Sequence, residues 1–214
     1  FRTELPEETD GLEYSVTPDG SSYIVTSFKG DNSSEHVITP EEENGHIENP
    51  ITVTVPKMHN GKPVSGIGTA AFKDCRSITE INLPATVTSI GKNAFENCIG
   101  LEGLILPENT TAFEEGAFWN CRNLKWLVIP KSVKKIGLGA ILNDTKLSTV
   151  FYTGTEEEWN LLEKNIESGN SALKIFSKRI LSKAAEIRFE YDGTTPIELI
   201  APGKTEDVIA EGGN

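Results

Sequence analysis

The chain has 214 residues, 37% hydrophobic and 24% charged, with 20 Lys and Arg against 32 Asp and Glu and a formal net charge of -12. This length and composition indicate a globular protein with a core of its own. The negative charge, without a basic run that could neutralise phosphates, argues against nucleic acid and anionic lipid surfaces as partners. No apolar stretch approaches the ~20 residues needed to cross a bilayer, so we expect no membrane insertion.

The first patterned segment lies upstream of residue 50. Tyr14 and Val16 precede the sequence Pro18-Asp19-Gly20, and Tyr23 and Val25 follow it, each pair separated by one residue. Alternation with a period of two is typical of a strand with one buried face. The Asp-Gly pair is typical of a turn.

A short motif then repeats every 23 residues: AFKDC ends at Cys75, AFENC at Cys98 and AFWNC at Cys121. Apolar residues fall into columns in the same register. The columns are Ile78, Leu101, Leu124 and Leu147; Ile81, Leu104, Leu127 and Val150; Leu83, Leu106, Ile129 and Tyr152; and, later in the unit, Ile90, Phe113 and Ile136. A fixed period of this length with apolar columns indicates stacked units that cannot bury their hydrophobic sides alone. The sequence therefore predicts a solenoid over residues 51–152.

Each unit contains one predicted strand, in which apolar residues alternate and a proline follows. Stacked strands of this kind form a narrow parallel sheet on one flank of the solenoid. The AFxxC segment favours a tight helical turn on the other flank. An earlier, imperfect unit begins near Val53, where KMHNGKPV inserts extra residues around an Asn60-Gly61 turn.

The segment after Tyr152 predicts an α/β unit. Thr155 and Glu158 form a capping box, and Trp159, Leu162 and Ile166 share one helical face. A second amphipathic run contains Leu173, Phe176, Ile180, Leu181 and Ala184, and Ile187, Phe189 and Tyr191 alternate as a strand. From residue 192 the chain is rich in Gly, Pro and acidic residues, which is typical of a linker or tail.

The units ITEINLPATVTSIGKNAFENC and LKWLVIPKSVKKIGLGAILND resemble the BspA-like (Treponema pallidum type) leucine-rich repeat, whose pattern is roughly LxxIxIPxxVxxIxxxAFxxC. The segment LEYSVTPDGSSYIVTSFKG resembles the N-terminal hairpin of that family, and FYTGTEEEWNLL resembles its closing unit. The predicted fold is therefore an α/β, right-handed leucine-rich-repeat solenoid. We expect an N-terminal β-hairpin cap over 1–50, repeats over 51–152, a C-terminal α/β cap over 153–191 and an acidic tail or linker over 192–214.

The resemblance also implies a place in the cell and a class of activity. Members of the family are largely surface or secreted proteins of host-associated bacteria, and adhesion and protein recognition are implied for them. We therefore expect a protein of the cell surface or the extracellular space. The chain begins with Phe1 rather than Met, so we expect that a signal peptide has been removed.

The three cysteines are expected to be buried free thiols, because each follows a core Phe within its turn. A strained disulfide between neighbouring coils and a metal site are the alternatives. The column just before the cysteines contains Asp74, Asn97, Asn120 and Asn143, and we expect its side chains to bond backbone groups of the turn.

No catalytic pattern occurs in the sequence, and we expect no enzyme activity, no cofactor and no metal. His36, His46 and His59 lie upstream of the complete repeats, and no HExxH, GxSxG, P-loop or GxGxxG motif accompanies them. The acidic stretch from Glu41 to Glu48 could hold calcium, but a solvated loop is favoured.

The outward positions of the strands are the candidate site. Their first column is Thr52, Glu80, Gly103, Trp126 and Thr149, and their second is Thr54, Asn82, Ile105, Val128 and Phe151. Ile105, Trp126, Val128 and Phe151 are predicted to form an exposed apolar patch, with Gly103 leaving room for the indole. Such patches on soluble proteins tend to mark contacts with partners. Glu80 and Asn82 would form the polar margin.

These residues predict non-catalytic binding of a protein partner through the strand-lined face. Two alternatives remain open for the function: carbohydrate binding on Trp126, and a structural spacer within a larger surface protein. Two also remain open for the face itself. Its β-branched residues could reflect strand preference alone, or the C-terminal segment could cover it.

Overall fold

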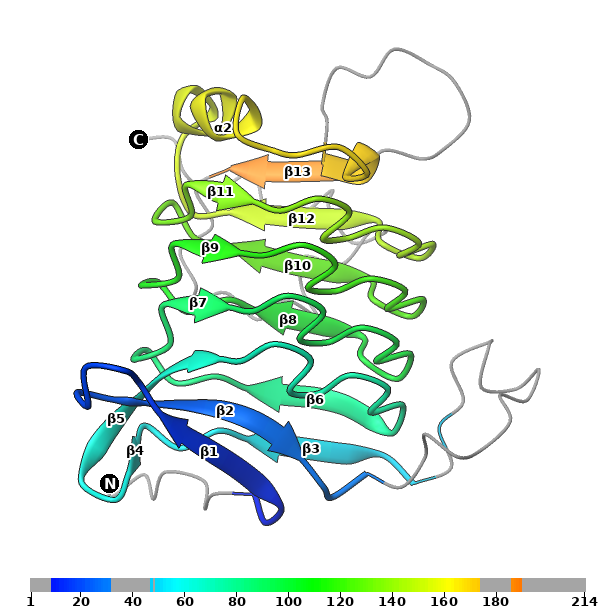
Figure 1. Ribbon diagram of the computed structural model, residues 1–214. Coiled ribbons are helices and arrows are strands. Elements are labelled where there is room, and N and C mark those ends of the chain that lie inside the picture. Colours follow the sequence, from blue (N-terminus) through cyan, green and yellow to red (C-terminus); the bar gives the residue numbers. More distant parts are fainter. Residues whose placement is uncertain (1–8, 32–46, 48, 174–185, 190–214) are drawn as a thin grey trace, which may run out of the picture.

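The computed structural model describes residues 9–31, 47, 49–173 and 186–189 as an elongated stack of coils (Figure 1). Each complete coil of the repeat places a short strand on each of two flanks and returns through a turn. The predicted solenoid is confirmed. Several predicted features lie outside the described residues: the second amphipathic run beyond Leu173, the tail from 192, His36, His46 and, apart from position 47, the acidic stretch 41–48. The division of the chain at residues 50, 152 and 191 stays a prediction.

The N-terminal strands form an antiparallel hairpin that continues into the first flank of the solenoid. In this hairpin β1 (Leu12–Val16) pairs with β2 (Tyr23–Phe28). Strand β2 then pairs in parallel with β5 (Lys62–Ile67), which also forms a small antiparallel pair with β4 (Met58–His59). The turn between β4 and β5 contains Asn60 and Gly61, both with positive φ, as a tight Asn-Gly turn requires.

Two parallel ladders then run along the stack. The first ladder continues from β5 through β7 (Ser89–Ile90), β9 (Ala112–Phe113) and β11 (Lys135–Ile136). The second flank contains the predicted strands: β3 (Ile51–Thr54) pairs with β6 (Ile78–Asn82), and β8 (Gly103–Ile105), β10 (Trp126–Ile129), β12 (Thr149–Tyr152) and β13 (Glu186–Phe189) form a four-stranded sheet. The predicted parallel sheet is present, and the ladder of two-residue strands opposite it was not predicted.

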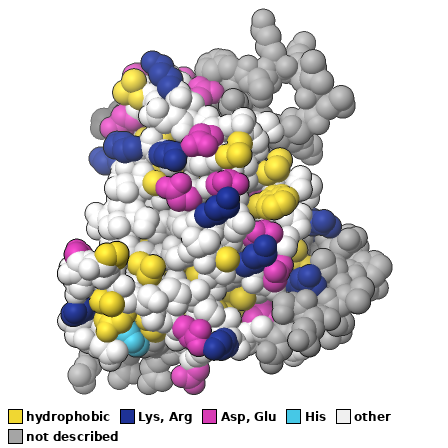
Figure 2. Space-filling model, viewed as in Figure 1, with side chains coloured by type: hydrophobic (Ala, Val, Ile, Leu, Met, Phe, Trp, Pro, Cys, Tyr) yellow, Lys and Arg dark blue, Asp and Glu magenta, His cyan; other side chains and the backbone are white. Residues whose placement is uncertain are grey.

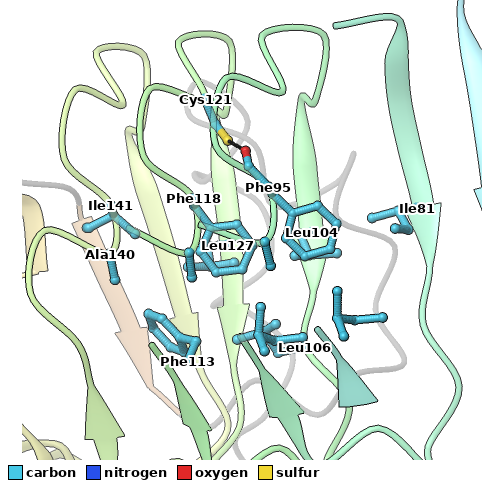
Figure 3. Close-up of a cluster of buried hydrophobic side chains, with 14 of the residues drawn as sticks. Ile81, Phe95, Leu104, Leu106, Phe113, Phe118, Cys121, Leu127, Ala140 and Ile141 are labelled. Carbon is cyan, nitrogen blue, oxygen red and sulfur yellow. Dashed lines mark hydrogen bonds between the residues drawn. The ribbon is translucent and has the colours of Figure 1, made fainter. Parts of the chain in front are cut away.

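The core lies between the two ladders and is built from the repeated apolar columns. Phe72, Phe95 and Phe118 form a continuous stack with ring centroids 5.2 and 5.4 Å apart and ring planes within 2° of parallel. Figure 3 shows Phe95 and Phe118 in this stack beside Leu104 and Leu127. All of these side chains are buried, which confirms the inward direction predicted from the period.

The AFxxC segments are hydrogen-bonded turns rather than α-helices. Within one turn the amide of Cys98 donates to the Phe95 carbonyl at 3.2 Å. Between coils, the amide of Phe72 donates to Ala94 at 2.8 Å and that of Asp74 donates to Glu96 at 2.8 Å. Backbone groups of the turn are therefore satisfied partly by the next coil, which an α-helix would not allow.

After β12 the chain turns into helix α2 (Glu156–Glu163), which carries the predicted capping box between Thr155 and Glu158. Trp159 and Leu162 are buried against the last coil. Ile166 makes an isolated parallel bridge to Ile136, and a short 3-10 turn η2 (Ser171–Leu173) ends this described range. Strand β13 adds to the edge of β12 in parallel.

Candidate binding face of the strands

The three cysteines are free and buried, as predicted, and two of them bond one coil to another. The Cys98 thiol donates to the Phe72 carbonyl at 3.1 Å, and the Cys121 thiol donates to Phe95 at 3.1 Å (Figure 3). Burial raises the pKa of Cys75 to about 12 and raises the pKa of Cys98 and Cys121 well above the usual value. Thiolate chemistry is therefore disfavoured at all three positions.

The column beside the cysteines differs from the prediction. Asp74, Asn97, Asn120 and Asn143 all have φ between 62 and 68°, a conformation that Asn and Asp tolerate better than most residues. Their described bonds run between side chains rather than to the turn: Asn97 Nδ2 donates to Asp74 Oδ1 at 2.6 Å, and Asn120 Nδ2 donates to Asn97 Oδ1 at 2.7 Å. Repetition at one position thus creates a hydrogen-bonded ladder, and a single unit of sequence contains no signal for it.

Asp144 takes the place of the fourth cysteine. Its Oδ1 accepts a hydrogen bond from the Cys121 amide at 2.8 Å, and its Oδ2 has no hydrogen-bond partner in the structure. Burial raises the pKa of this carboxyl well above its usual value, and the bond from Cys121 opposes the rise. The Cys-to-Asp exchange therefore keeps a link between coils but places a polar group in the core.

Other types of site are not evident in the described ranges. No group of three or more His, Cys, Asp or Glu side chains there is placed to hold a metal ion. No described helix is long and apolar enough to span a bilayer. His59, the one histidine described, stacks on Tyr14 with ring centroids 3.9 Å apart and meets Tyr23 edge-on at 4.9 Å.

The outward strand face changes along the stack. Glu80 and Asn82 on β6 are exposed, Ile105 on β8 is 48% exposed, and Trp126 on β10 is partly exposed. Val128 and Phe151 are 2% and 1% exposed, so the prediction that they lie open to solvent is wrong. The two side chains form a small buried cluster of their own, with Trp126 packed against it.

The register of the sheet contributes to this burial. Val128 pairs with Ile105 on one side and with Phe151 on the other, and Phe151 in turn pairs with Arg188 of β13. Phe151 is thus an inner position of the sheet rather than an edge. Thr149, the outward neighbour of Phe151 on β12, is also buried. Alternation along a strand predicts the direction of a side chain, and exposure depends on its neighbours in space.

Gly103 leaves room for the indole of Trp126, as predicted. A Cβ atom at Gly103 would lie 1.9 Å from Cε2 and 2.2 Å from Cζ2 of that indole. The six-membered ring therefore lies directly over the backbone of β8. No other residue type fits at position 103 without moving the ring.

Of the six predicted site residues, the structure brings four together at the open surface. Ile105 and Trp126 supply apolar area, and Glu80 and Asn82 lie on β6, the next strand toward the N-terminus (Figure 1). The Glu80 carboxylate accepts a hydrogen bond from the Thr52 hydroxyl at 3.5 Å, the limit of such a contact. Val128 and Phe151 form the buried cluster against which Trp126 packs.

Sequence reasoning missed a second apolar group, on the turn flank. Trp119, Leu138 and Leu142 are 40%, 43% and 41% exposed. In the preceding coils the same columns contain the ion pairs Lys73–Glu96 and Lys92–Glu115, at 3.0 and 2.9 Å. Figure 2 shows one group of hydrophobic side chains at the right of the later coils, with Lys or Arg and Asp or Glu side chains below it. The change from charged to apolar residues within one column is the sequence signal.

The sequence pattern described as BspA type Leucine rich repeat region matches residues 53–161 in six copies. None of the curated proteins matches the chain. Among solved structures, a leucine-rich repeat protein of T. pallidum is 25% identical with a TM-score of 0.50, over 68% of this chain and 71% of that one. One from Bacteroides capillosus is 26% identical with a TM-score of 0.51, over 69% and 98%. One from Bacteroides ovatus is 27% identical with a TM-score of 0.51, over 69% and 37%.

Proposed function

Because the chain belongs to the BspA-type leucine-rich repeat family, we propose that it is a non-catalytic protein-binding module of the cell surface or the extracellular space. Repeat solenoids commonly present an extended surface to a partner, since each coil adds one row of side chains to it. Adhesion to a host protein or to a neighbouring cell is the activity we infer for this one. The acidic charge of -12 supports a protein partner over a nucleic acid.

The observation that carries the proposal is the composition of the open strand face. Trp126 and Ile105 offer apolar area on a rigid sheet, and Glu80 and Asn82 border it with exposed polar groups. Binding sites for proteins commonly combine an aromatic or aliphatic centre with a polar rim. Trp126 is held by Gly103 beneath and by Val128 and Phe151 beside it, so little conformational entropy would be lost on binding.

Site-specific photo-cross-linking of the whole chain tests this proposal. A photoreactive p-benzoylphenylalanine is placed at Ile105 on the strand face, or at Leu142 on the turn flank, where the exposed fraction is similar. Surface proteins of candidate cells are then irradiated with each variant, and the adducts are identified by mass spectrometry. We expect one protein to be captured from position 105 and not from position 142.

The captured protein is then purified and its affinity measured directly. Trp126→Ala is expected to weaken binding by about 2 kcal/mol, roughly 30-fold in Kd, because a central tryptophan typically dominates such interfaces. Circular dichroism checks that the variant is folded. Equal capture from both positions, or an unchanged Kd, would contradict the proposal. Quenching of Trp126 fluorescence by a saccharide would favour carbohydrate binding instead.

A further inference from the structure

Resting on the proposed function, we propose that the strand face receives an arginine side chain of the partner. The guanidinium pairs with the carboxylate of Glu80 and lies against the indole of Trp126. The aliphatic part of the arginine, or an apolar neighbour, covers Ile105. Two independent observations support this assignment: the position of the Trp126 indole, and the lack of a described cationic partner for Glu80.

The indole extends toward Glu80 because Gly103 has no side chain. Glu80, Gly103 and Trp126 occupy the same position in three successive units of the repeat. The ring atoms Cε2, Cζ2 and Cδ2 of Trp126 fill the space where a side chain at position 103 would stand. Strand β6 contacts β8, although the two strands belong to different sheets, so the ring over β8 lies on the side of β10 that faces Glu80.

Glu80 has no cationic partner among the described residues. Four glutamates of the neighbouring coils differ from it in this respect: Glu96, Glu102, Glu114 and Glu115 each have a lysine ammonium within 2.9 to 3.6 Å. The one described contact of Glu80 is the bond from Thr52 at 3.5 Å. An exposed carboxylate without a counter-charge, beside an aromatic ring, is complementary to a cation.

Arginine fits this pair of groups better than lysine does. Its guanidinium is planar, so it can stack on an indole while its N–H groups point in the ring plane toward a carboxylate. It also binds a carboxylate through two parallel hydrogen bonds, which a lysine ammonium cannot do. Arginine is enriched in the energetically dominant positions of protein interfaces for the same reasons.

The test uses the whole chain and two capped peptides as probes. The peptides are identical except that one contains arginine between leucines and the other contains citrulline, which has the same shape without the charge. Binding at low salt is followed by NMR through the indole Nε1–H resonance of Trp126, assigned with Trp126→Phe. We expect the arginine peptide to bind roughly 5- to 30-fold more tightly, and added salt to reduce this ratio.

Two variants locate the effect. Glu80→Gln is expected to bring the ratio of the two affinities close to one, because it removes the charge and keeps the shape. Glu115→Gln, which alters an exposed carboxylate already paired with Lys92 on the turn flank, leaves the ratio unchanged. Gly103→Ala is expected to displace the indole of Trp126 and so to weaken binding of the arginine peptide, although the charge of the protein does not change.

The outcomes separate this inference from the function on which it rests. Equal affinity for both peptides, no arginine-dependent shift at Trp126, or a preference that survives Glu80→Gln would overturn the arginine assignment. If the photoreactive residue at position 105 still captures a partner in that case, the protein-binding proposal stands without the arginine assignment. If position 105 captures nothing, the proposed function fails whatever the peptides show.

Discussion

The turn flank and the strand face use the same 23-residue period in different ways. On the turn flank the inner columns keep one residue type through successive coils, as with Phe72, Phe95 and Phe118. On the strand face the outward column changes at every coil, from Glu80 to Gly103 to Trp126. Repeated residues bond one coil to the next, and changing residues give this chain a surface of its own.

The difference has a simple physical cause. A residue in a repeated column of the turn flank must fit the corresponding parts of the coils on either side: rings stack on rings, thiols bond carbonyls, and amides bond amides. One exchange would break two contacts. An exposed outward residue of the strand face, such as Glu80 or Ile105, meets solvent on one side and is free of this requirement.

The largest effect is expected from breaking a repeated column at its centre. Phe95→Ala should destabilise the protein by about 3–5 kcal/mol, because it opens a cavity between two stacked rings in a fully buried site. Urea denaturation measures the loss. Ile105→Ala on the strand face is the control, with an expected loss below about 1 kcal/mol. Similar losses for both variants would contradict the comparison.

The next effect concerns the place where the cysteine column already changes. Burial raises the folded-state pKa of Asp144, so the carboxyl is destabilising once ionised. The protonated carboxyl favours the folded state. This contribution to the free energy of unfolding is fully present below the unfolded-state pKa and is lost as the pH rises through the folded-state pKa. Asp144→Asn keeps an acceptor for the Cys121 amide and has no charge to bury. We therefore expect the variant to gain stability relative to the natural chain as pH rises.

Urea denaturation at several pH values between about 4 and 8 checks this, and the gain cannot exceed about 1.4 kcal/mol per pH unit. Glu108→Gln, which changes an exposed carboxyl in the loop after β8, is the control variant. A stability difference between Asp144→Asn and the natural chain that stays constant across this pH range would show that the pKa of Asp144 is the same in the folded and unfolded states.

A smaller loss is expected when the asparagine ladder is interrupted. Asn97→Ala should cost about 1–3 kcal/mol, because it removes bonds to Asp74 and Asn120 and places alanine at a φ of 62°. Asn97→Gly removes the same bonds but adopts this backbone conformation easily. It should therefore retain part of the stability that the alanine variant loses. Equal losses would assign the whole effect to the hydrogen bonds.

The sequence was sufficient for the features that depend on local pattern. The period located the inward columns, and the Thr155 to Glu158 spacing located a helix start. Strands such as β7 and β9 were not predicted, because two residues are too few to show alternation. Pairing with the neighbouring coil creates these strands.

The candidate site was predicted only in part, for a related reason. The outward direction of Ile105, Trp126, Val128 and Phe151 follows from alternation, but their exposure depends on what lies next to them in space. Val128 and Phe151 are buried in a cluster of their own, and Ile105 is not. The packing of the Trp126 indole over Gly103 was predictable, since the repeat places the two residues in one column.

The smallest effect is expected in an outer column of the turn flank, where two ion pairs provide a matched comparison. Lys92 and Glu115 are both about half exposed, so water and salt screen their attraction and Lys92→Gln should change stability by less than about 0.5 kcal/mol. Glu96 differs, because its side chain is 9% exposed and its Oε2 has no hydrogen-bond partner in the structure. Lys73→Gln removes the cation beside this buried carboxylate and should cost measurably more. Urea denaturation of both variants at low and high salt measures the two losses of stability. Equal losses would mean that the exposure of an ion pair does not decide its contribution to stability. The greater tolerance of outward positions to substitution would then be wrong.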